Sequence, residues 1–189
     1  MPSRQHIVIA SCAAAVLAGL AFLYEMAGAP VHAPPASLAP FRGESAAAPL
    51  PGAPFVDAEG HALSPAVFRG RYVLLNLWAP WCAPCLRELP ALAALSRAAP
   101  GLRVVAIDVG RDPNANDAGA FLSVNGAAGL PVYLDTHAAL MRAFHTYGLP
   151  LTVLIDPNGK EVARALGAAP WDSKDSISYF RGLTAHAAS

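Results

Sequence analysis

Three short and almost wholly apolar runs constrain the fold of this chain more than any other feature. Residues 72–78 read Y-V-L-L-N-L-W, residues 102–109 read L-R-V-V-A-I-D-V, and residues 151–156 read L-T-V-L-I-D. Aliphatic and β-branched runs of this length are typical of strands that are buried on both faces of a sheet. A chain with such strands has to cover both faces of the sheet with other elements.

Helical patterns alternate with these strands. Residues 82–98 carry leucines at positions 86, 89, 92 and 95, a spacing that keeps them on one helical stripe. Strands that alternate with helices and end in a hairpin predict an α/β fold with a mixed central sheet and helices on both faces. Weaker patterns predict helices over residues 64–70, 114–124, 138–144 and 171–183, and short strands over residues 54–57, 131–135 and 161–166.

The composition excludes wholesale disorder and gives no sign of a nucleic-acid partner. Of the 189 residues, 54% are hydrophobic and 14% are charged, which suits one folded domain with additional segments. Thirteen basic and thirteen acidic residues cancel, so the net charge predicts neither a nucleic-acid-binding surface nor a site for acidic substrates.

The first 26 residues predict a membrane segment. Residues 7–24 form an uncharged run of eighteen residues, which as a helix spans about 27 Å, close to the ~30 Å hydrocarbon core of a bilayer. Because Arg4 lies on the short N-terminal side, the positive-inside rule predicts a single-pass anchor with the rest of the chain outside the cytoplasm. The small residues at positions 27–29 keep open the alternative of a cleaved signal sequence and a secreted protein.

Residues 27–51 differ in composition from the chain that follows them. Six of these 25 residues are proline and eight are alanine, without a helical or strand period. Such a composition is typical of a semi-extended tether that holds a domain away from a membrane. The sequence therefore predicts a membrane segment over residues 1–26, a linker over residues 27–51 and a folded domain over residues 52–189.

The chemistry of the chain depends on its paired cysteines. Cys82 and Cys85 stand in the run W-A-P-W-C-A-P-C, whereas Cys12 lies in the N-terminal apolar run and is assigned no role. A structural zinc site needs four ligands, and the scattered histidines lack ligand spacing. A copper site made of both thiolates and one remote histidine stays open. A structural disulfide also stays open, although the small loop that it would close removes little unfolded-state entropy.

The position of the pair favours reversible redox chemistry. Cys82 follows a buried strand and opens a helix, so its sulfur is expected near the free amides of the first helical turn, which favour the thiolate. Cys85 lies one turn further into the helix, where it is more buried and near enough to resolve a mixed disulfide. The position therefore suits an attacking Cys82 and a resolving Cys85.

Two segments resemble those of a known family. Residues 78–90, W-A-P-W-C-A-P-C-L-R-E-L-P, and residues 148–160, G-L-P-L-T-V-L-I-D-P-N-G-K, are similar to segments of the membrane-anchored TlpA/ResA-like thiol-disulfide oxidoreductases. The resemblance covers residues 52–185 and implies a thioredoxin-like fold with extra N-terminal strands and a central strand-helix insert.

The resemblance implies a substrate-binding surface around the cysteines. Pro150 matches the proline that follows a cis peptide in this fold and faces the cysteine pair, which lets the backbone of Leu149 pair with an extended partner. An ordinary trans proline at the start of a strand is the alternative. Trp81, Ala83 and Pro84 adjoin the cysteines and complete the predicted surface.

The resemblance also points to Glu88 as an acid-base group. Glu88 matches an acidic residue near the resolving cysteine, and on a helix it lies three positions beyond Cys85, which suits proton transfer. A solvated surface glutamate is the alternative. Thioredoxins carry a buried aspartate at the position of Asn76, and because an amide cannot titrate, Glu88 is the better acid-base candidate.

The resemblance implies a reductant of protein disulfides on the periplasmic side of a bacterial inner membrane. Its expected substrates are the haem-site cysteines of apocytochrome c or the copper-site cysteines of an oxidase. Its expected electron donor is a membrane protein of the DsbD/CcdA kind. The expected redox group is the Cys82–Cys85 disulfide, with no metal and no other cofactor. A disulfide-forming oxidase and a copper-handling module on the same fold are the alternatives.

Overall fold

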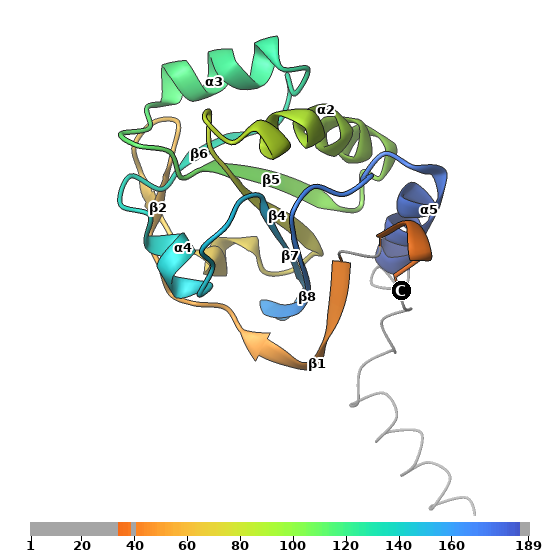
Figure 1. Ribbon diagram of the computed structural model, residues 1–189. Helices are drawn as coiled ribbons and strands as arrows, with labels where there is room; N and C mark the ends of the chain where they lie inside the picture. Colours follow the sequence, from red (N-terminus) through yellow and green to blue (C-terminus); the bar gives the residue numbers. More distant parts are fainter. Residues whose placement is uncertain (1–33, 39–40, 186–189) are drawn as a thin grey trace, which may run out of the picture. The chain divides into compact units, whose positions relative to one another are not determined.

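The three apolar runs form strands, as predicted, and these strands are neighbours at the centre of the sheet. β4 (Val73–Trp78) pairs in parallel with β5 (Arg103–Asp108) and antiparallel with β7 (Leu151–Ile155). Every residue of β4 and β7 is buried, which explains why their sequences are apolar without alternation. The computed structural model describes residues 34–38 and 41–185, apart from the side chains of residues 42–47 (Figure 1).

Shorter strands extend this centre into a mixed sheet of eight strands in the order β1-β8-β7-β4-β5-β6-β2-β3. On one side β6 (Val132–Leu134) is parallel to β5, and β2 (Phe55–Asp57) and β3 (Ala62–Leu63) follow it with antiparallel pairing. On the other side β8 (Lys160–Leu166) is antiparallel to β7, and β1 (Phe41–Pro49) is antiparallel to β8. The predicted mixed sheet is confirmed.

Helices cover both faces of this sheet, as predicted. Alternate residues of β4 point to opposite faces, so that Leu74 and Trp78 belong to one core cluster and Leu75 and Leu77 to the other. The helices α2 (Ala83–Ala98), α3 (Ala115–Val124) and α5 (Lys174–Ala185) contribute buried residues to the first cluster. The second lies beneath α4 (Ala139–Ala143) and the 3₁₀ turn η2 (Pro65–Phe68), and Figure 1 shows α2 and α4 on opposite sides of the strands.

The folded part of the chain begins before the predicted boundary at residue 52. The 3₁₀ turn η1 (Ala36–Leu38) and β1 both fall in the stretch predicted as a linker, and Leu38 and Phe41 are buried in the first core cluster. The linker prediction is therefore wrong for residues 41–49. An edge strand of small residues lacks an apolar alternation, and it forms here because β8 offers unpaired backbone groups.

The last helix begins at Lys174 rather than at the predicted residue 171. The hydroxyl of Ser173 accepts a hydrogen bond from the N–H of Ser176 at 3.1 Å, which is the arrangement of a helix N-cap. Trp171 consequently lies in the loop before the helix, where it is fully buried. This displacement matters because Trp171 contacts the candidate site.

The predicted membrane segment and Cys12 lie outside the described residues. Within the part of the chain that the structure describes, no helix combines the length and the apolar character needed to cross a membrane.

Candidate active site

The paired cysteines form a disulfide at the start of α2. Cys82 is the N-cap of this helix, and its Sγ accepts a hydrogen bond from the N–H of Cys85 at 3.3 Å. The S–S distance is 2.07 Å and the Cα atoms are 5.3 Å apart. Cys82 is 4% exposed and Cys85 is fully buried. The predicted difference in burial and the predicted place of Cys82 at the helix N-terminus are confirmed.

A cis peptide bond joins Leu149 to Pro150, as predicted. Leu151, the next residue, pairs with Leu77 of β4 and with Leu166 of β8. Because β4 leads directly into the cysteine loop, this pairing brings the cis-proline loop to the end of the sheet that carries the disulfide. Among the described residues, none forms a hydrogen bond with the backbone of Leu149, so its N–H and C=O remain available to a partner.

Glu88 lies on the buried face of α2, one turn beyond Cys85, and only 2% of it is exposed. Its Oε1 accepts a hydrogen bond from Nδ2 of Asn76 at 2.7 Å, and its Oε2 accepts one from the indole N–H of Trp171 at 2.9 Å. The backbone N–H of Ala169 also donates to Oε2, at 3.3 Å. The alternative of a solvated surface glutamate is therefore wrong.

Burial dominates the electrostatics of this carboxyl. Removal from water disfavours the charged form and raises the pKa of Glu88 to about 7, while the hydrogen bonds from Trp171, Asn76 and Ala169 oppose that rise. All three donors are uncharged. A carboxyl with a pKa near 7 exchanges protons readily at neutral pH, which is the property that an acid-base group requires.

The structure adds residues that the sequence alone did not place in the site. Nδ2 of Asn76 also donates to the hydroxyl of Thr152 at 2.9 Å, so β4, β7, α2 and the loop before α5 meet in one polar cluster. Trp171 and Ala169 are 83 and 81 positions from Glu88 in sequence. The one signal in the sequence was the tryptophan itself, because a buried indole N–H usually has a hydrogen-bond acceptor.

The residues predicted to contact a substrate lie around the disulfide. Trp81 is 68% exposed, Ala83 is exposed and Pro84 is half-buried. Pro150 is buried and Leu149 is half-buried. Tyr147, which was not predicted, is 99% exposed in the same loop.

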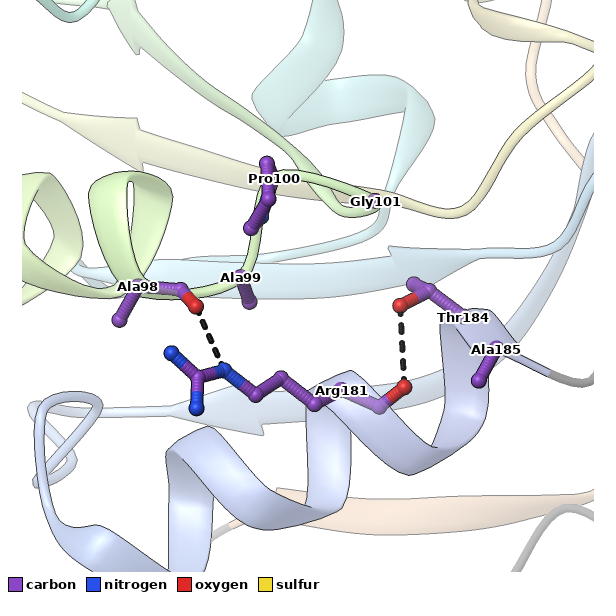
Figure 2. A pocket seen from close by; sticks show the side chains of 7 residues that line it. All are labelled: Ala98, Ala99, Pro100, Gly101, Arg181, Thr184 and Ala185. Atoms are coloured by element: carbon purple, nitrogen blue, oxygen red, sulfur yellow. Dashed lines mark hydrogen bonds between the residues drawn. The ribbon is translucent and has the colours of Figure 1, made fainter.

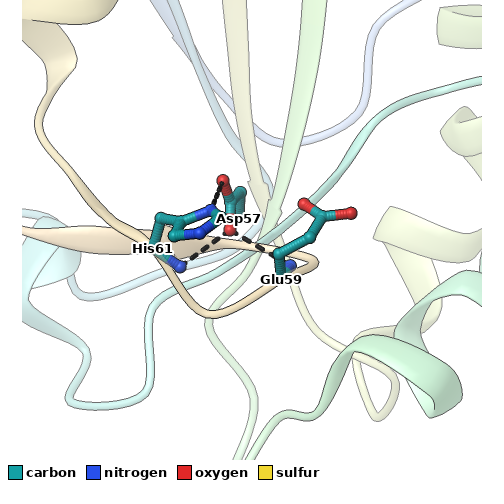
Figure 3. Close-up of side chains that lie close together, drawn as sticks. All are labelled: Asp57, Glu59 and His61. Carbon is teal, nitrogen blue, oxygen red and sulfur yellow. Dashed lines mark hydrogen bonds and ion pairs between the residues drawn. The ribbon is translucent and has the colours of Figure 1, made fainter.

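Two other features lie apart from the disulfide. Asp57, Glu59 and His61 form the one cluster of potential metal ligands in the described chain, and neither cysteine belongs to it. Nδ1 of His61 is 3.0 Å from Asp57 Oδ2, and Oδ1 of Asp57 accepts hydrogen bonds from the backbone N–H groups of Glu59 and His61 (Figure 3). These contacts stabilise the turn between β2 and β3.

A shallow hollow lies at the opposite end of α2 from Cys82, between that end and α5 (Figure 2). Nε of Arg181 donates to the carbonyl of Ala98 across it at 2.7 Å, and its remaining lining consists of Thr184 and small or apolar residues. None of the residues that line this hollow lies near the cysteines, so we assign the hollow no part in their chemistry.

The sheet order, the N-capping disulfide and the cis-proline beside it define the class: this is a thioredoxin-like α/β protein. The Redoxin family model matches residues 40–179, which is most of the chain, and the chain belongs to the Redoxin family. The match includes β1 and so agrees with the earlier start of the folded part.

Comparison with individual proteins identifies the members of this superfamily that the chain resembles. The chain is 34% identical over 113 residues to the thiol-disulfide oxidoreductase ResA of Bacillus subtilis, covering 59% of this chain and 62% of that protein. It is 35% identical over 111 residues to ResA of Geobacillus kaustophilus, and this match covers 55% of this chain and 59% of that protein. The chain thus spans about 60% of the length of these relatives. The resemblance to ResA-like members of the thioredoxin superfamily is confirmed.

A solved structure supports the same fold. The crystal structure of a protein assigned as thiol:disulfide interchange protein DsbE from Chlorobium tepidum superimposes with a TM-score of 0.62 and 26% sequence identity. The match covers 73% of this chain and 96% of that one.

Proposed function

We propose that this chain is a thiol-disulfide oxidoreductase that exchanges disulfides with other proteins through Cys82 and Cys85. The observation that carries the proposal is the position of Cys82 at the N-terminus of α2, where its sulfur accepts the N–H of Cys85. An amide that donates to this sulfur favours the thiolate over the thiol, and the thiolate is the attacking form. The ResA relatives carry the same activity in their names.

The reaction with a substrate disulfide takes two displacement steps. The Cys82 thiolate attacks one substrate sulfur, the substrate S–S bond breaks, and the other substrate sulfur leaves as a thiolate that takes up a proton. Cys85 then loses its proton to the carboxylate of Glu88, and its thiolate attacks Cys82. The second substrate sulfur leaves, so two electrons have passed to the substrate and the pair has become a disulfide.

The surface around the pair suits an extended polypeptide substrate. Trp81, Ala83 and Pro84 present the outer side of the active-site loop, and the loop that ends at Pro150 lies at the same end of the sheet. The free backbone groups of Leu149 are in position to pair with an extended segment of the substrate.

The N-terminal apolar run and the resemblance to ResA support a proposed cellular setting. Residues 7–24 anchor the chain in a bacterial inner membrane, and the domain acts on the periplasmic side as a reductant. Its substrates are cysteines of apocytochrome c or of a copper-site protein, and a membrane donor of the DsbD/CcdA type restores the dithiol. The disulfide is its sole redox group.

Trapping the mixed disulfide tests the proposal and the two roles. In the full chain, Cys85→Ser removes the resolving thiol, so a covalent complex through Cys82 should accumulate with a protein disulfide substrate and dissolve on reduction. The matched variant Cys82→Ser should trap no substrate. Trapping by Cys82→Ser alone would reverse the roles, and trapping by neither variant would refute the activity.

A further inference from the structure

Trp171 reaches the carboxyl of Glu88 from the loop between β8 and α5. The indole is fully buried, and its N–H donates to Oε2 of Glu88 at 2.9 Å. The N–H of Ala169, two residues earlier in this loop, donates to the same oxygen at 3.3 Å. One loop therefore supplies two donors to one carboxylate oxygen.

Aromatic packing holds the indole in this direction. Phe41 of β1 meets the Trp171 ring edge to face with 5.6 Å between ring centroids, and Phe180 of α5 lies at 6.3 Å. Phe41 and Phe180 contact each other at 6.0 Å. Because a close-packed core leaves little room for a ring of this size to turn, the N–H stays directed at Glu88.

The two oxygens of Glu88 consequently face different chemistry. An indole N–H and a backbone N–H can only donate, so a proton placed on Oε2 would oppose two donors and find no acceptor. Oε1 contacts the amide of Asn76, a group that offers a donor and an acceptor. The Oδ1 of Asn76 is buried and has no hydrogen-bond partner among the described residues. The amide can therefore serve either protonation state of Oε1.

We propose that Trp171 is a positioning residue of the redox site: with the amide of Ala169 it occupies Oε2 of Glu88 and leaves Oε1 as the oxygen that exchanges a proton with Cys85. The inference rests on the proposed oxidoreductase activity. In this step the S–H bond of Cys85 breaks, the electron pair stays on sulfur and the proton bonds to Oε1. The proton then leaves Oε1 to solvent, which restores the carboxylate.

The groups that form hydrogen bonds around Glu88 do not titrate, so none of them competes with the carboxyl for the proton of Cys85. β4 contributes Asn76, β7 contributes Thr152 behind it, and the loop contributes Trp171 and the Ala169 amide. All of these are uncharged. On α2 itself, Cys85 lies one turn before Glu88 and is also buried, and it becomes a titratable thiol when the disulfide is reduced.

The matched variants Trp171→Phe and Trp78→Phe test the inference. Trp171→Phe keeps an aromatic ring against Phe41 and Phe180 but removes the donor to Glu88. Trp78 is buried in the same core cluster, and its indole N–H has no hydrogen-bond partner in the described chain, so Trp78→Phe loses a donor that serves no acceptor. Both changes remove the same atoms from the same core.

The first measurement is an NMR titration of the Glu88 carboxyl and of the indole N–H signals in the full chain with the pair oxidised. We expect the Trp171 signal to titrate with Glu88 near pH 7 in the unchanged protein and to become flat in Glu88→Gln. Trp171→Phe should raise the Glu88 midpoint by about one pH unit, because a hydrogen bond to a charged group is lost. Trp78→Phe should leave it unchanged. An unshifted midpoint in Trp171→Phe overturns the inference.

The second measurement is the pH dependence of substrate release from the mixed disulfide. In Trp171→Phe the rate should fall about fivefold at pH 7 and recover by pH 9, because a one-unit shift lowers the ionised fraction of Glu88 from about a half to about a tenth. A shifted midpoint with an unchanged rate profile would also overturn the inference. Failure of both Cys85→Ser and Cys82→Ser to trap a substrate would instead refute the proposed activity, while the titration still reports on Trp171.

Discussion

At Glu88 the folded chain binds a proton more tightly than the unfolded chain does, because burial raises the pKa of the carboxyl from 4.5 to about 7. Well below pH 4.5 the group is protonated in both states and adds no pH dependence to the stability. Between these two values the unfolded chain releases its proton first, so the stability of the fold decreases as the pH rises. Above pH 7 the loss is complete and amounts to about 3 kcal/mol.

The variant Glu88→Gln should remove this dependence. With the pair oxidised, urea unfolding of the unchanged protein should show a free energy of unfolding that falls between pH 4.5 and pH 7.5 by about 3 kcal/mol more than in the variant. Glu59→Gln, which changes an exposed carboxylate, should behave like the unchanged protein. Parallel stability curves for Glu88→Gln and the unchanged protein would contradict the raised pKa.

Trp81 tests whether the exposed side of the active-site loop contacts a protein substrate. Because 68% of Trp81 is exposed, Trp81→Ala should change the free energy of unfolding by less than about 0.5 kcal/mol. Steady-state kinetics should nevertheless show a higher KM for a folded protein disulfide and an unchanged rate with a small aromatic disulfide. Val124→Ala, at an exposed position on α3, should alter neither. Equal losses with both substrates would place Trp81 in the chemistry rather than in docking.

Among the elements, β1 makes an unexpected contribution to the core. Phe41 is 2% exposed and packs against Trp171 and Phe180. Phe41→Ala should therefore lower the free energy of unfolding by about 3–5 kcal/mol, the range for truncating a buried phenylalanine. Urea unfolding of the full chain measures the change. Val67→Ala, at a position that is 46% exposed, is the control and should cost less than about 1 kcal/mol. A small effect of Phe41→Ala would mean that β1 does not pack on the domain.

The sequence predicts elements well where burial leaves a pattern and poorly where it does not. β4, β5 and β7 are mostly apolar without alternation because both of their faces are covered, and α2 keeps its leucines on one stripe. β1 is held by backbone pairing with β8, and small side chains leave no such pattern. The start of α5 depends on the Ser173 hydroxyl, a local contact that the apolar spacing does not show.

In the candidate site, too, local motifs predict some residues, whereas others depend on contacts between distant parts of the chain. Cys82, Cys85 and Pro150 are readable because their chemistry depends on short local motifs. The burial of Glu88 and its bond to Trp171 join residues 83 positions apart, and they exist only once the loop before α5 has folded over α2. No local pattern of charge or apolarity encodes such a contact.

At the scale of the whole molecule, the sheet order gathers the functional groups at one end. Leu151 pairs with both Leu77 and Leu166, so the starts of the cysteine loop and of α2 lie beside the cis-proline loop and the end of β8. Trp81 of the cysteine loop is 68% exposed, Tyr147 of the cis-proline loop is 99% exposed, and Leu166 at the end of β8 is 61% exposed. Exposed apolar side chains around a reactive disulfide favour docking of a polypeptide over a small polar disulfide.

The reduction potential of the full chain decides the direction of electron flow. A dithiol pair is a strong oxidant when its reduced, thiolate form is stabilised. Here the buried ionisable side chain that shares a face of α2 with Cys85 is the carboxyl of Glu88, whose charged form disfavours a second negative charge. We therefore expect a potential closer to that of thioredoxin, about −270 mV, than to that of DsbA, about −120 mV.

Equilibration with glutathione buffers, followed by alkylation of free thiols, measures this potential. Each step of 30 mV corresponds to about 1.4 kcal/mol, so the two reference values are well separated by this method. The variant Cys85→Ser cannot close the intramolecular disulfide, so in the same buffers it should form only a mixed disulfide between Cys82 and glutathione. This variant serves as the control for the reactivity of Cys82 alone. A potential near −120 mV would contradict the proposal that the chain reduces protein disulfides. It would favour a disulfide-forming oxidase, because the cysteine pair would then take electrons from protein thiols.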